Sequence, residues 1–108
     1  MSIAIADIEF ANHSYDERGD VLYLSVAGYE GPPADALSSD EGHNVEWDAD
    51  GRVIAMTLVG VRWHLERDGV LTITLPREHL TPAELAALAT STVSASAELL
   101  APALRPAA

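Results

Sequence analysis

The sequence predicts an α+β fold, with an antiparallel sheet of about five strands built from hairpins and one or two C-terminal helices packed on it. Short segments of alternating apolar and polar residues, separated by turn sequences, fill the first two-thirds of the chain. The apolar spacing becomes helical after residue 80. We therefore expect a single α+β domain over residues 1–90, followed over residues 91–108 by an Ala- and Ser-rich tail, helical or frayed.

The first two expected strands form a hairpin. Ile8–Ser14 alternates loosely between apolar and polar residues, which is typical of a half-buried strand. Val21–Val26 follows the turn sequence DERGD and is rich in β-branched and aromatic residues. Residues 28–42 come next, and their glycines and adjacent prolines predict an irregular connection.

A second hairpin is expected around the turn sequence DADG. His43–Trp47 alternates before this turn, and Arg52–Val61 follows it as the longest apolar strand. Because Arg52–Val61 is apolar on both faces, we expect it to be central and covered on both sides. The helix is expected to cover one face of the sheet, and a second subunit the other face or a sheet edge. Val70–Leu75, after the turn sequence ERDG, is the last expected strand.

The helical segment begins at residue 81. Thr81 is suited to the N-cap, Pro82 to the first helical position and Glu84 to the third, which together make a capping box. The leucines that follow fall on one helical face. We expect this helix to cover one face of the sheet and to break near residues 90–94, where β-branched residues and serines disfavour it.

Charge is the most unusual global feature. The 108 residues carry a formal net charge of −11, with six arginines and no lysine, and 15 of the 17 acids precede Thr81. Nucleic acid and anionic membranes need a basic surface, so we expect neither as a partner. The chain has no cysteine, which excludes disulfides and suits the cytoplasm. We expect no signal peptide and no membrane span.

The stretch YDERGD offers two interpretations. Asp16, Glu17 and Asp20 could bind a divalent cation through oxygen atoms, but further ligands at alternating positions are missing. A hairpin turn is favoured, in which Asp16 accepts backbone N–H groups and Gly19 adopts a positive φ. In that case Tyr15 and Tyr23 are expected to pack across the strand pair.

DADG likewise combines a metal-like pattern with turn chemistry. Asp48 and Asp50 look like the start of a calcium loop, but no bidentate Glu follows at the required distance. Gly51 permits a positive φ and Arg52 begins the next strand, so a turn is favoured.

The four histidines leave a metal site open. None belongs to an HExxH or an i, i+4 helical pair, although two or three could converge in the fold. They are His13, His43, His64 and His79. No nucleophile elbow and no phosphate-binding glycine loop is present in the sequence.

Two segments together, YDERGDVLYLSV and EGHNVEWDADGRVIAMTLVGV, resemble the bacterial domain-of-unknown-function family 2283. The family has a Tyr-Asp pair before an Asp and an aliphatic-Tyr-aliphatic strand, and later an acidic Asp-Gly-Arg turn. The resemblance covers about residues 10–61. Where the family commonly has Gly-Ile-Glu, this chain has Ala55, Met56 and Thr57, so Thr57 cannot fill any role of that Glu. Some members look like partners of toxin-like proteins, and the family has no assigned activity.

The sequence favours a non-catalytic, homodimeric interaction or regulatory module, and leaves enzymatic activity open. One alternative is an antitoxin-like neutraliser of a basic protein, and another is a metal- or small-molecule-binding enzyme that uses His and Asp residues. We expect no cofactor and no catalytic or metal-ligating residue. The residues expected to be structural are Tyr15, Asp16, Gly19, Asp20, Tyr23, Asp48, Asp50, Gly51 and Arg52.

Overall fold

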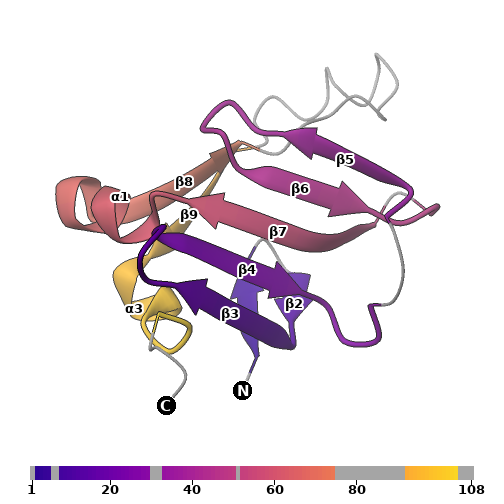
Figure 1. Ribbon diagram of the computed structural model, residues 1–108, viewed down its shortest axis with the longest axis horizontal. Coiled ribbons are helices and arrows are strands. Elements are labelled where there is room, and N and C mark those ends of the chain that lie inside the picture. Colours follow the sequence, from indigo (N-terminus) through magenta and orange to yellow (C-terminus); the bar gives the residue numbers. More distant parts are fainter. Residues whose placement is uncertain (1, 6–7, 30–32, 51, 75–91, 105–108) are drawn as a thin grey trace.

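The computed structural model describes residues 2–5, 8–29, 33–50, 52–74 and 92–104. Its main element is a five-stranded antiparallel sheet, which confirms the expected α+β fold and sheet type (Figure 1). The strands, in their spatial order, are β3 (Asn12–Asp16), β4 (Val21–Ser25), β7 (Val53–Val59), β6 (Asn44–Trp47) and β5 (Asp35–Ser38). The long apolar strand β7 is central, as expected.

Two small antiparallel sheets and two short helices complete the described fold. One sheet is the hairpin of β1 (Ile3–Ile5) and β2 (Ile8–Phe10), and the other pairs β8 (Val70–Thr74) with β9 (Thr92–Ser96). Helix α1 (Val61–Asp68) joins β7 to β8, and α3 (Ala97–Leu100) follows β9. In Figure 1, β2, β9 and α3 lie behind the main sheet, on the same side of it.

The core lies between the main sheet and these elements. Leu22, Met56 and Leu58 are among the buried side chains of the main sheet. On β4 the buried residues alternate with partly or fully exposed ones, and on β7 this alternation begins at Met56, because Ala55 before it is also buried. The side chains that complete the buried cluster from the other elements are Ile3, Ile5, Phe10, Val61, Leu71, Ile73, Ala95, Leu100 and Ala103. The C-terminal segment is therefore part of the core. Strand β9 corrects the expectation of a helical or frayed tail for residues 92–96, whereas α3 is helical as expected.

Several strand boundaries differ from those expected. The segment expected as one strand, Ile8–Ser14, divides into β2, which pairs with β1, and β3, which pairs with β4. Strand β5 lies in the connection that we expected to be irregular, because its sequence DALS has no β-branched or aromatic residue to indicate a strand. Strand β8 pairs with β9 rather than joining the main sheet.

Helix α1 was not expected, because its N-terminus has no local capping signal. Its N-cap is Gly60, in a left-handed conformation and without a side-chain cap, and its first turn contains no acid. Gly69, also left-handed, ends the helix and donates its N–H to the carbonyl of Leu65. The helix expected from Thr81, together with His79 and Gly51, lies outside the described residues.

Candidate functional site

The main sheet has one face turned toward the core and a second face, here called the open face, that no described element covers (Figure 1). The pairing register places side chains of neighbouring strands in rows across this open face. The first row is Asp16, Val21 and Val59, the second is Ser14, Tyr23, Thr57, Asn44 and Ser38, and the third is Asn12, Ser25, Ala55, Glu46 and Ala36.

The open face is polar but almost uncharged. Seven of its thirteen side chains carry a hydroxyl or a carboxamide, four are small or branched apolar groups, and only Asp16 and Glu46 are acids. Tyr23 is the largest of them and remains 48% exposed. The polar side of strand β6 was recognisable from its alternation, but sequence reasoning did not identify the surface that five strands build together.

A hollow of about 410 Å³ lies on the open face, between Asn12 on β3 and Glu46 on β6. Tyr23 and Tyr29 contribute to its lining, and Ala55, which is small and buried, also lies there. The Tyr29 hydroxyl donates to Oε2 of Glu46 at 3.3 Å. Burial and the charge of Glu46, with this hydrogen bond, raise the pKa of Tyr29 above its ordinary value.

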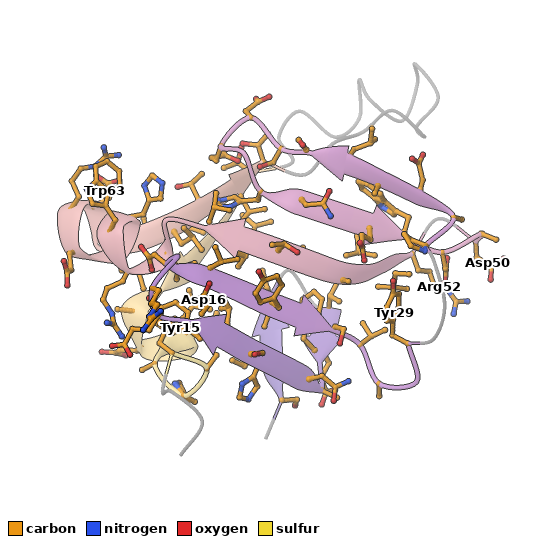
Figure 2. All side chains as sticks on the ribbon, viewed as in Figure 1. Tyr15, Asp16, Tyr29, Asp50, Arg52 and Trp63 are labelled. Carbon is orange, nitrogen blue, oxygen red and sulfur yellow. The ribbon has the colours of Figure 1, made fainter. Side chains whose placement is uncertain are left out.

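A second hollow, of about 450 Å³, adjoins the first at Tyr29. Asp48 and Arg52 contribute to its lining. Figure 2 shows Tyr29, Asp50 and Arg52 at one end of the main sheet, and Tyr15 and Asp16 near the other. The two acidic turns therefore lie at opposite ends of the sheet, with the open face between them.

The YDERGD turn caps helix α1 through Asp20. Its Oδ1 accepts the Tyr15 hydroxyl at 2.6 Å and the backbone N–H of Arg62 at 2.8 Å. Its Oδ2 accepts the N–H of Trp63 at 3.0 Å. These two N–H groups belong to the first turn of α1, where no intrahelical acceptor is available. Asp20, which is more than forty residues earlier in the chain, therefore caps the N-terminus of α1 in place of an N-cap side chain.

Asp20 and Tyr15 shift each other's ionisation. Burial alone would raise the pKa of Asp20, but the Tyr15 hydroxyl, the two backbone N–H groups and the charge of Arg62 lower it below its ordinary value. Burial, the hydrogen bond to Asp20 and the charge of Asp20 raise the pKa of Tyr15 to about 12. Asp20 is therefore held as an anion and Tyr15 as a neutral donor near pH 7.

Two details of the YDERGD turn correct the sequence interpretation. Asp20, with φ 55°, adopts the left-handed conformation that we expected of Gly19. Tyr15 lies opposite Leu22 and Tyr23 lies opposite Ser14, so the two tyrosines are on different faces and do not pack together. Asp16 accepts the N–H of Arg18 at 3.2 Å, which agrees with its expected role in the turn.

The DADG turn is closed by bonds within the turn itself. Oδ1 of Asp48 accepts the N–H groups of Asp50 and Arg52, each at 2.9 Å. The backbone N–H of Asp48 donates to the carbonyl of Arg52, also at 2.9 Å. Asp48 thus has the turn chemistry that the sequence predicts.

His43 is fully buried between two sheets, where it has a structural role. Its Nδ1 accepts the N–H of Val59 at 3.0 Å, and its Nε2 lies 3.1 Å from the carbonyl of Thr72 and can donate to it. Burial lowers the pKa of His43, although the Thr72 carbonyl and the charge of Glu41 oppose this. Both bonds require the neutral tautomer with hydrogen on Nε2.

The other described histidines do not form a metal site with His43. His13 is exposed on β3, and His64 lies on α1 beside Trp63, with 4.9 Å between the ring centroids. Among the described residues, no group of three or more His, Cys, Asp or Glu side chains is arranged to hold a metal ion. Both oxygens of Asp20 already accept hydrogen bonds.

Among the described helices, none is long and apolar enough to cross a membrane.

Comparison with known proteins identifies no relative. No protein-family model, no curated protein and no solved structure matches the chain.

Proposed function

We propose that the protein is a non-catalytic interaction module that acts as a homodimer, with the open face of one copy packed on the open face of another. The observation that carries this proposal is the distribution of charge. In a chain of net charge −11, the open face presents only two carboxylates among thirteen side chains. Two copies that meet here avoid most of the repulsion between their acidic turns.

The polar chemistry of the open face also suits self-association. A two-fold interface brings the same surface together with itself, so its hydrogen-bonding groups must complement one another. Hydroxyls and carboxamides both donate and accept, whereas carboxylates only accept. Seven of the thirteen side chains are of the first kind. The apolar side chains Ala55 and Val59 of the central strand β7 lie among them.

A basic protein partner is the second candidate, as expected for an antitoxin-like neutraliser. The acids that favour it lie in the turns at the two ends of the main sheet, among them Asp16, Glu17, Asp48 and Asp50. Such a partner would contact these ends rather than the open face. We also propose a cytoplasmic location and kinship with family 2283, which rest on the sequence alone.

Light scattering of the purified chain at two salt concentrations tests the homodimer. We expect a dimer at micromolar concentration that persists or strengthens at high salt, because screening weakens the repulsion between two acidic copies. Binding to a basic partner would instead weaken with salt. A monomer at both salt concentrations would overturn the proposal.

A charge variant on the open face sharpens this test. Thr57→Glu places a new carboxylate in the middle of the proposed interface, and the matched control, Ser94→Glu, adds the same charge to an exposed position on β9. We expect only Thr57→Glu to give a monomer. Circular dichroism should show that both variants remain folded.

A further inference from the structure

We infer that the two-fold axis of the dimer runs along β7, and that Tyr23 of each copy enters the hollow on the open face of the other. This inference rests on the homodimer proposed above and specifies its geometry. In this arrangement, an aromatic side chain of the partner subunit occupies the hollow.

The order of strands defines two symmetric arrangements. Sheets packed face to face keep their strand directions within about 30° and lie about 10 Å apart. Because β7 has two strands on each side, an axis along β7 places β4 over the partner's β6 and β3 over the partner's β5. An axis across the strands instead places every strand over its own copy.

Charge distinguishes the two arrangements. Glu46, on β6, is the only acid in the interior of the open face. An axis across the strands brings the β6 strands together and allows Glu46 to approach Glu46 of the partner subunit. An axis along β7 separates the two Glu46 side chains by two strand spacings, about 10 Å sideways. It also places Glu46 over β4 of the partner subunit, which carries Ser25 and Tyr23.

The Tyr23 hydroxyl can donate a hydrogen bond and the Glu46 carboxylate can accept one. Among the described residues, no group accepts from the Tyr23 hydroxyl, and only the Tyr29 hydroxyl donates to Glu46. With the axis along β7, Tyr23 lies over β6 of the partner subunit, one row from Glu46. A tyrosine is long enough to cover this diagonal and to donate to the carboxylate. The resulting contact occurs twice in each dimer.

Cross-linking tests the direction of the axis, because the chain contains no cysteine to interfere. Ser14 on β3 and Ser38 on β5 are both exposed and lie in the same row. We expect a bismaleimide with a spacer of about 10 Å to join Ser14→Cys to Ser38→Cys in a mixture of the two variants. Neither variant alone should cross-link, because identical residues on β3 or β5 lie about 19 Å apart across the strands.

The outcomes separate this inference from the homodimer itself. If light scattering shows a dimer but Ser38→Cys cross-links alone, the axis runs across the strands and the inference is wrong, although the proposed function stands. A dimer without the mixed cross-link has the same meaning. If the protein is a monomer, both fail.

A double-mutant cycle tests the Tyr23–Glu46 contact. We expect Tyr23→Phe and Glu46→Gln each to weaken the dimer about 10- to 100-fold, because each change affects two symmetric contacts. If the two side chains bond to each other, the double variant should be little weaker than either single one. Independent losses that multiply in the double variant would show that Tyr23 and Glu46 do not meet.

Discussion

Asp20 and Asp48 lie in acidic turns between neighbouring strands, and both carboxylates accept two backbone N–H groups. The N–H groups bound by Asp48 are two and four residues away, within its own turn. Those bound by Asp20 are 42 and 43 residues away, at the start of α1. Similar turn sequences therefore act at different levels of structure, one within a hairpin and the other between a hairpin and a helix.

This difference decides what each acid contributes to the fold. Without Asp48, the β6–β7 turn loses local bonds that water can replace, because the turn is largely exposed. Without Asp20, two N–H groups of α1 and the Tyr15 hydroxyl lose their acceptor together. No other side chain in the described part of the protein caps the N-terminus of α1, so the position of this helix against the main sheet depends on Asp20.

Replacement of the two acids should give the largest contrast. We expect Asp20→Ala to reduce the free energy of unfolding by about 2–3 kcal/mol, since it removes hydrogen bonds to a charged acceptor and a helix cap. Asp48→Ala should cost about 1 kcal/mol or less. Urea unfolding at equal protein concentration measures both. Equal losses would mean that the long-range cap adds nothing to the local turn.

Acid should weaken the protein through Asp20. Its pKa in the folded state is below the ordinary value of 3.8, so the unfolded state takes up the proton first. The stabilisation is thus complete well above pH 3.8 and is lost as the pH falls below it. In Asp20→Asn, which tolerates the positive φ, this part of the pH dependence should disappear. Thermal unfolding of both proteins between pH 2 and pH 6 gives the comparison, and parallel curves would exclude Asp20 as the cause.

Removal of the Tyr15 hydroxyl tests how much its hydrogen bond to Asp20 stabilises the protein. Tyr15→Phe should cost about 1 kcal/mol near pH 7, because Asp20 loses one donor but keeps two. The folded-state pKa of Tyr15 is about 12, above the ordinary 10.0, so its stabilisation is present below pH 10 and is lost as the pH rises toward 12. A urea series from pH 8 to pH 11 should show a steeper loss of stability for the native chain than for the variant.

Gly19→Ala should have the smallest effect. Gly19 is outside the left-handed region, and a Cβ there would lie 2.9 Å from Oδ2 of Asp16, the end of a flexible side chain that can move. We expect a change below about 0.5 kcal/mol. A loss above about 1 kcal/mol in urea unfolding would mean that Asp16 cannot move and that this turn is rigid on its own.

Most of the α+β fold was predictable because it follows from local apolar patterns and turn sequences. Strand β6 alternates clearly, β4 and β8 are rich in β-branched and other apolar residues, and β7 is a long apolar run; the antiparallel hairpins follow from the short acidic turns. Strand β9 had a weaker signal in Thr92 and Val93, which disfavour a helix. Strand β5 had no signal in the sequence, because its residues have low β-propensity. It forms a strand through its pairing with β6.

The candidate site was less predictable than the fold. The alternation indicates which residues of each strand face outward, but the rows on the open face depend on which strands become neighbours. Tyr29 and Glu46, which meet at the hollow, are 17 residues apart and come from a loop and a strand. No spacing rule connects them.

The sequence by itself determined the hairpins, the turn role of Asp48 and the acidity of the chain, because these depend on residues that are close together or on composition alone. Only the tertiary structure decided that Asp20 caps α1, that His43 joins two sheets and that no described element covers one face of the main sheet. The physical reason is the range of the interactions. A turn is closed by its own backbone, whereas a helix cap or a buried imidazole needs partners that only folding brings within hydrogen-bonding distance.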